Sequence, residues 1–126
     1  MKNAVRQMLI DLGVNPSNKG FSELSKAILM VVDKCEPMKM KEIYQMIYPE
    51  AQVKYCSFDR NCRWAIENAY LVDTEMFKRL FGQTEKCPNL KFFIHAVATL
   101  EHFYTRNPSI FISICFRFFL GCHSFE

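Results

Sequence analysis

The sequence predicts an all-α protein, a compact bundle of about six to seven short helices that contains a helix-turn-helix. The chain has 126 residues, 50% hydrophobic and 23% charged, which is the size and mixture of one globular domain with a substantial core. Its 4 glycines and 5 prolines are too few for a sandwich of many short, turn-linked strands. Before residue 105, every apolar pattern has the helical period, and none alternates over the length of a strand.

Apolar residues at helical spacing identify the first three helices. The first runs from about Asn3 to Leu12 and ends at Gly13, a residue type that favours the left-handed conformation after a helix. The second ends before Pro37, because the residue preceding a proline avoids the α conformation, and its apolar stripe predicts the most buried helix. The third is short and ends at Tyr48. The apolar stripes consist of Val5, Met8, Leu9 and Leu12, then Phe21, Leu24, Ala27, Ile28, Val31 and Val32, then Met40, Ile43, Met46 and Ile47.

The next segment predicts the helix-turn-helix. Pro49 fits the first position of a short fourth helix over residues 49–55, where its missing N–H costs nothing. Residues 56–57 form the turn, and Ser57 is a suitable N-cap for a long helix over residues 58–72. The side of that helix expected to face the core consists of Phe58, Cys62, Ala65, Ile66, Ala69 and Val72.

The opposite side of the 58–72 helix carries hydrogen-bonding groups around one large aromatic residue. The second helix of a helix-turn-helix lies in the major groove, where Arg, Asn, Gln or Glu reads base edges and Lys, Ser or backbone N–H groups bind phosphate. The residues expected to read bases are Arg60, Asn61, Arg63, Trp64 and Glu67, and those expected to bind phosphate are Lys54 and Ser57. A solvated helix face is the alternative interpretation. Trp64 argues against it, because a tryptophan within a polar stripe usually contacts a partner surface or a neighbouring helix.

The remaining elements are two helices and a segment of different composition. Thr74 caps a short helix that ends at Phe81, and Asn89 starts the last regular helix, which reaches Tyr104. Residues 105–126 contain an apolar run that is too short to span a bilayer, which takes about 20 residues. An added strand, a hydrophobic docking tail and an aggregation-prone end all remain open for this segment.

Charge, cysteine and histidine patterns exclude several functional classes. The formal charge of +3, from 16 basic and 13 acidic residues, restricts any nucleic-acid site to a local patch. The 6 cysteines follow no readable signal peptide and have no metal-ligand spacing, so we expect free, mostly buried thiols in a cytoplasmic protein. His95 and His102 are expected to be ordinary helix residues. We expect neither an enzyme nor a cofactor or metal, since no paired carboxylates, Cys/His nucleophile or phosphate-binding glycine loop can be identified.

Five blocks of the sequence resemble a known family. They are LIDLGVNPSNKGFSELSKAI (9–28), IYQMIYPEAQVKY (43–55), RWAIENA (63–69), LFG (80–82) and PNLKFFI (88–94). Their order and spacing over residues 3–104 resemble the C-terminal effector domain of the sporulation initiation master regulator, the stage-zero sporulation protein A family. The resemblance implies an all-helical, DNA-binding transcription regulator of endospore-forming bacteria, with a helix-turn-helix effector domain over residues 1–104 and an apolar tail over 105–126. We expect no receiver domain, and therefore no phosphorylation switch.

The reading helix departs from the family pattern. Asn61 and Trp64 stand where the family has arginines, Arg63 stands where it has a glutamate, and Glu67 stands where it has a basic residue. A lost bidentate base contact costs about 1–3 kcal/mol of discrimination. The resemblance therefore implies the scaffold more strongly than it implies the family's usual DNA box.

Two functional hypotheses remain. In the first, the domain regulates transcription by binding double-stranded DNA through the 58–72 helix, with a homodimer on DNA as one arrangement. In the second, it is a protein-interaction module that pairs with a full-length family member or with RNA polymerase, for example its sigma subunit, without specific DNA binding. Trp64 and the apolar tail favour the second hypothesis, which would use helices that include residues 89–104.

Overall fold

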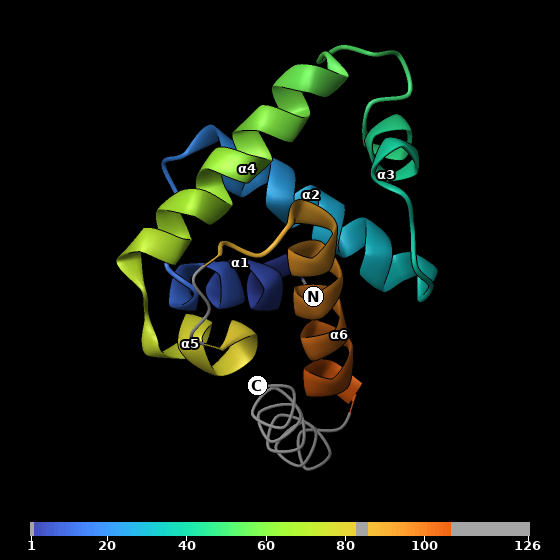
Figure 1. Ribbon diagram of the computed structural model, residues 1–126. Coiled ribbons are helices and arrows are strands. Elements are labelled where there is room, and N and C mark those ends of the chain that lie inside the picture. Colours follow the sequence, from blue (N-terminus) through green and yellow to red (C-terminus); the bar gives the residue numbers. More distant parts are fainter. Residues whose placement is uncertain (1, 83–85, 107–126) are drawn as a thin grey trace.

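Six helices form the described part of the protein. The computed structural model describes residues 2–82 and 86–106, and within these residues it contains no strand (Figure 1). The helices are α1 (Lys2–Asp11), α2 (Lys19–Lys34), α3 (Met40–Ile47), α4 (Tyr55–Val72), α5 (Glu75–Phe81) and α6 (Leu90–Arg106). The predicted all-α fold is confirmed. From residue 107 onward, the expected apolar tail lies outside the described residues.

α2 is the central helix of the bundle. It packs against α1, α3, α4 and α6 (Figure 1). Every residue of the apolar stripes predicted for α1 and α2 is buried. Because α2 contacts four neighbours, its apolar side is covered from several directions. Among the described residues it contributes more buried positions than any other helix, as predicted.

The connection between α1 and α2 is fixed by backbone hydrogen bonds and a cap. Gly13 has a φ of 96°, the left-handed conformation that glycine adopts without steric cost, and its N–H donates to the carbonyl oxygen of Ile10 at 3.0 Å. The side-chain oxygen of Asn18 then accepts the N–H of Gly20 at 2.9 Å and caps α2. These bonds set the direction in which α2 leaves α1.

The largest difference from prediction lies between α3 and α4. Residues 49–55 do not form a helix, and α4 begins at the last of these positions. Ala51 has a φ of 54°, outside the right-handed helical region, so a helix cannot pass through it. The hydroxyl of Tyr44 on α3 donates to the carbonyl oxygen of Val53 and holds the connection against α3. The arrangement of α3, the connection over residues 48–54 and α4 is consistent with a helix-turn-helix that has a longer turn than predicted.

The start of α4 also differs from prediction. Its N-cap is Lys54, whose side chain makes no capping hydrogen bond, and Ser57 lies in the first turn with its N–H donating to the Lys54 carbonyl oxygen at 3.1 Å. The buried face of α4 is as predicted except for Val72, which is 61% exposed. Val72 is the last residue of the helix and is followed by Asp73 in the left-handed conformation, so it extends past the core.

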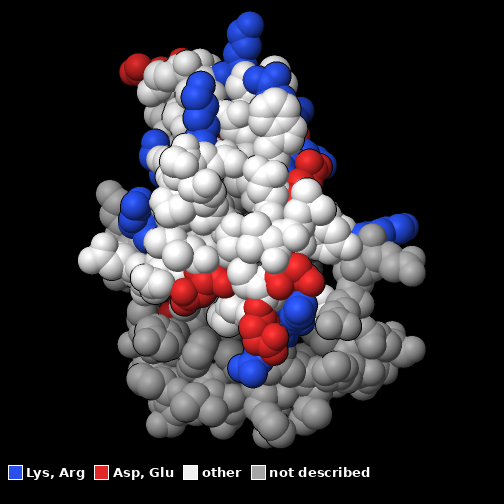
Figure 2. Space-filling view, turned by 90° about the vertical axis from the view of Figure 1, so that its left-hand side faces the viewer, with Lys and Arg blue, Asp and Glu red and all other residues white. Residues whose placement is uncertain are grey.

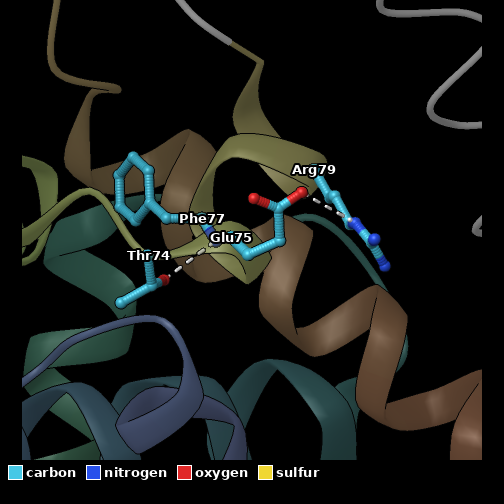
Figure 3. A network of polar contacts seen from close by, with 4 residues as sticks. All are labelled: Thr74, Glu75, Phe77 and Arg79. Carbon is cyan, nitrogen blue, oxygen red and sulfur yellow. Dashed lines mark hydrogen bonds and ion pairs between the residues drawn. The ribbon is translucent and has the colours of Figure 1, made fainter.

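α5 begins at the predicted cap. The Thr74 hydroxyl oxygen accepts the N–H of Phe77 at 3.1 Å, and on the exposed side of the helix Glu75 pairs with Arg79 at 3.3 Å (Figure 3). Because Thr74 satisfies an N–H that has no partner within the helix, it defines where α5 begins.

α6 begins at its predicted cap and closes the bundle. The Asn89 side-chain oxygen accepts the N–H of Phe92 at 2.8 Å, and the helix continues to Arg106, slightly beyond the predicted end. The Phe93 ring of α6 stacks on the Phe81 ring of α5 with their centres 5.2 Å apart. Aromatic packing thus fixes α5 against α6.

The four described cysteines are free thiols in different environments. Cys62 is buried, Cys87 is half-buried, and Cys35 and Cys56 are exposed. The prediction of mostly buried thiols is therefore wrong for this part of the chain, because Cys35 and Cys56 lie at helix ends, where the backbone leaves the core. The other two cysteines lie outside the described residues.

His95 is more than an ordinary helix residue. Its Nε2 accepts the N–H of Met38 at 3.0 Å, and its Nδ1 contacts the carbonyl oxygen of Lys91 at 2.8 Å. These two bonds require the neutral ring with its proton on Nδ1. His95 therefore ties the connection between α2 and α3 to α6, whereas the side chain of His102 lies outside the described residues.

Candidate nucleic-acid interface

The outer face of α4 carries a local basic patch. Figure 2 shows the side of the molecule along which α4 runs: most of the Lys and Arg side chains lie in the upper part of this view with few Asp or Glu among them, whereas the lower part carries Asp and Glu side chains mixed with Lys and Arg. Lys54, Arg60 and Arg63 are exposed in the N-terminal part of this region, whereas the exposed acidic residues Asp73 and Glu75 follow the helix at its other end. Positive charge is therefore concentrated near the start of α4.

Arg60 and Trp64 form a pair on this face. The guanidinium carbon of Arg60 lies 5.3 Å from the centre of the Trp64 ring, within the range of a cation–π interaction. Trp64 is 55% exposed, so the expectation that it lies on the exposed side of α4 is confirmed.

Arg63 forms a second pair, with Asp59. Arg63 Nε lies 2.7 Å from Asp59 Oδ2, a short, charge-assisted hydrogen bond between residues one helical turn apart. The Arg63 side chain is 59% exposed, whereas that of Asp59 is 24% exposed. The hydrogen bond to Asp59 raises the pKa of Arg63 above its ordinary value, because the charged guanidinium is the form that donates to the carboxylate. Sequence reasoning missed Asp59, although an acidic residue four positions before an arginine is a recognisable helix pattern.

Asn61 lies at the inner edge of α4 and is directed toward α2. Its side-chain nitrogen donates to Glu23 Oε1 at 3.5 Å, and the residue is half-buried. The backbones are in close contact here, since a Cβ on Gly20 would lie 2.1 Å from the Asn61 carbonyl oxygen. Asn61 thus differs in orientation from the other four residues predicted to read bases.

Glu23 is a nearly buried carboxyl group beneath α4 that was not predicted from the sequence. Burial raises the pKa of Glu23 above its usual value, while the hydrogen bond from Asn61 and the charges of Lys26 and Lys19 oppose this effect. A polar contact therefore lies at the junction of α2 and α4, directly below the basic patch.

The remaining predicted site residues extend the same surface. Glu67 is exposed farther along α4, Ser57 is half-buried in the first turn, and Lys54 is exposed at the N-cap. Because no side chain caps α4, its first N–H groups and the positive end of its dipole can attract an anion.

An aromatic cluster of Tyr44, Tyr48, Tyr55 and Phe58 fixes the N-terminal end of α4 against α3. The Tyr44 ring centre lies 5.2 Å from that of Tyr55 and 5.8 Å from that of Phe58, and the Tyr48 ring lies 6.1 Å from Phe58. The cluster was not predicted, because its members come from separate elements. It sets the orientation of the start of α4, and hence of the basic patch, relative to the rest of the bundle.

Beyond the basic patch, the C-terminal end of α4 exposes apolar side chains. Leu71 is 77% exposed and Val72 is 61% exposed. Together with Asn68 and with Asn15 of the α1–α2 connection, they line an open hollow of about 530 Å³. The outer face of α4 therefore changes from basic to apolar along its length.

Comparison with known proteins assigns the family. The model of the family described as sporulation initiation factor Spo0A C terminal matches residues 5–100. The chain belongs to this family. The match to the Spo0A C-terminal family covers α2 to α5 completely and most of α1 and α6, so the resemblance seen in the sequence is confirmed. This family is a DNA-binding effector domain of sporulation initiation. No curated protein and no solved structure gives a significant match.

The described part of this Spo0A C-terminal family member contains neither a cluster of metal-binding side chains nor a membrane-spanning helix. Within residues 2–82 and 86–106, no group of three or more His, Cys, Asp or Glu side chains is arranged to hold a metal ion. In the same part of the chain, no helix combines the length and apolarity needed to cross a membrane.

Proposed function

We propose that this domain regulates transcription by binding double-stranded DNA, with the outer face of α4 in the major groove. The observation that carries the proposal is the basic patch, in which two exposed arginines lie beside the uncapped start of α4. The aromatic cluster supports it, because a reading helix must be held rigidly by its neighbour. Membership of the Spo0A C-terminal family supports it independently. A bacterial DNA target places the protein in the cytoplasm.

The residues of this surface take different roles. Arg60, Arg63 and Trp64 contact bases, with Glu67 farther along the groove, because Arg binds guanine edges and an indole can contact a thymine methyl group. Lys54 and Ser57 lie at the start of α4 and bind phosphate there. Asn61 contributes less than its neighbours, since its amide is engaged with Glu23.

Selection of bound duplexes from a random pool by the purified full chain tests the proposal. We expect a defined motif, and we expect Arg60→Ala and Arg63→Ala each to weaken binding to that motif by about 1–3 kcal/mol. Lys54→Ala should weaken binding to all sequences alike and flatten the salt dependence, because it removes a phosphate contact.

Arg79→Ala is the matched control. Arg79 is also exposed and also pairs with an acidic residue one turn earlier, but it lies on α5. Its replacement should leave the selected motif and the affinity for it nearly unchanged. Equal losses for Arg79→Ala and Arg63→Ala would show that only net charge matters, and absence of any selected motif would contradict the proposal.

The exposed apolar end of α4 favours a second candidate function. Trp64, Leu71 and Val72 expose apolar surface along one helix, which suits a protein partner. In this alternative, the domain pairs with a full-length family member or with RNA polymerase, for example through its sigma subunit. Trp64 is the only tryptophan in the chain, so its fluorescence distinguishes the two functions. A change produced by the selected duplex supports DNA binding, and a change produced only by purified sigma subunit or by a purified full-length family member supports the alternative.

A further inference from the structure

We propose that Asp59 is a positioning residue that holds the Arg63 guanidinium ready to read a guanine in the major groove. This inference rests on the proposed function. Asp59 lies on the proposed DNA-binding surface, where its negative charge repels phosphate and by itself weakens binding. The proposal gives this carboxylate a role. It also names the base that this part of α4 recognises.

The two partners of this ion pair differ in exposure: Asp59 is mostly covered, and Arg63 extends into solvent. Asp59 is 24% exposed and lies in the second turn of α4, whereas Arg63 is 59% exposed one turn later. The 2.7 Å bond uses Nε of Arg63, and the Nη1 and Nη2 groups are not part of it. These two groups form the edge of the guanidinium that donates to O6 and N7 of guanine. Asp59 therefore occupies the side of the guanidinium that guanine recognition does not need.

The ion pair is suited to ordering the side chain and contributes little to stability. An exposed pair one turn apart on a helix stabilises the fold only slightly. A free arginine side chain, by contrast, loses considerable rotamer freedom when it binds a base. Because the bond to Asp59 restricts Arg63 before DNA arrives, part of that entropy loss has already occurred in the free protein.

The repulsion between Asp59 and phosphate gives the proposal a distinctive signature. Removing the charge with Asp59→Asn should strengthen binding to unrelated DNA, because one anionic group leaves the surface. The same change should weaken binding to the selected motif relative to unrelated DNA, by about 2- to 10-fold, because Arg63 loses its support. A carboxylate with no positioning role would alter both affinities by about the same factor and leave their ratio unchanged.

The experiment compares variants of the full chain in selection from a random duplex pool and in titrations of the selected duplex. Asp59→Asn should lose preference for one guanine, whereas Asp59→Glu, which keeps a carboxylate one turn before Arg63, should retain it. In an Arg63→Lys background, which keeps the charge but lacks the forked donor edge, Asp59→Asn should have no further effect on base preference. Asp73→Asn is the matched control, since it removes an exposed carboxylate at the far end of α4 and should leave base preference unchanged.

A spectroscopic measurement tests the positioning without DNA. The Arg63 Nε–H signal in nuclear magnetic resonance should exchange slowly with water in the free wild type and in Asp59→Glu, and rapidly in Asp59→Asn. Circular dichroism verifies that each variant is folded. A selected motif that keeps the same base preference in Asp59→Asn overturns the positioning role but leaves the proposed function intact. A wild-type protein that selects no motif overturns both.

Discussion

Glu23 is a single carboxyl group whose ionisation opposes folding. Burial raises its pKa in the folded protein above the usual 4.5, so the folded state binds this proton more tightly than the unfolded state does. The free energy of unfolding therefore falls as the pH rises from the pKa of Glu23 in the unfolded state to its higher pKa in the folded state. At higher pH the ionised carboxylate continues to destabilise the folded protein.

Glu23→Gln should consequently stabilise the domain at neutral pH. Gln can still accept the hydrogen bond from Asn61 but carries no charge, so the gain over wild type should disappear as the pH falls below about 4. Urea denaturation of both proteins at neutral and acidic pH measures this difference. Glu75→Gln, on an exposed carboxyl, is the control. A gain that is equal at both pH values would contradict the assignment.

Individual side chains differ in how far they can be predicted from sequence. The exposure of Trp64 followed from helical phase, because a residue opposite a strong apolar stripe faces outward. Asn61 is close in helical phase to its exposed neighbours on α4. Because Gly20 has no side chain, α2 approaches α4 closely at this point, and Asn61 lies against α2. Helical phase cannot reveal how close the next helix comes, and the bond between Asn61 and Glu23 depends on that distance.

Thr74 determines where α5 begins, and its contribution can be measured (Figure 3). Thr74→Ala removes the acceptor for the N–H of Phe77 and should lower the free energy of unfolding by about 1 kcal/mol. Thr74→Ser keeps the hydroxyl and should retain most of the stability. Thermal or urea unfolding followed by circular dichroism provides the comparison, and equal losses in both variants would show that the methyl group matters more than the cap.

Helices with side-chain caps were predicted more accurately than the start of α4. α5 and α6 begin after Thr74 and Asn89, the caps predicted from the sequence, and each accepts a backbone N–H. The cap of α2, Asn18, was not predicted, although it is of the same residue type. α4 begins after Lys54 with no such bond, and the hydroxyl of Tyr44 holds the preceding connection. A helix was predicted over residues 49–55 because Pro49 fits the first turn of a helix. The hydrogen bond from Tyr44 to Val53 joins α3 to the connection that follows it, and a local sequence pattern does not reveal such a bond.

The bundle should unfold as one unit, because α2 contacts four other helices. Leu24→Ala on α2 removes a fully buried side chain and should lower the free energy of unfolding by about 2–5 kcal/mol. Circular dichroism and Trp64 fluorescence should report the same urea transition in both wild type and variant. Ile10→Ala is the control, since Ile10 is 42% exposed and its loss should cost clearly less. Two separate transitions would contradict a single cooperative core.

The overall architecture was the most predictable level. Apolar stripes of helical period specify which sides of α1, α2 and α4 are buried, and a small all-α domain has few other ways to cover them. In the stripe predicted for α3, only Ile43 is buried and Met46 is 42% exposed. The candidate site was only partly predictable. The residue types on the outer face followed from the sequence, whereas the pairs Asp59–Arg63 and Arg60–Trp64 depend on rotamers that packing and charge select in three dimensions.

The two sides of α4 carry separate requirements, and this has an evolutionary consequence. The buried side, with Phe58, Cys62, Ala65, Ile66 and Ala69, is constrained by close packing, so most changes there reduce stability. Most of the outer side makes contacts only within its own helix, so substitutions there leave the core intact. Descendants of one ancestral domain can therefore acquire new target preferences by successive point mutations on the outer side while every intermediate remains folded.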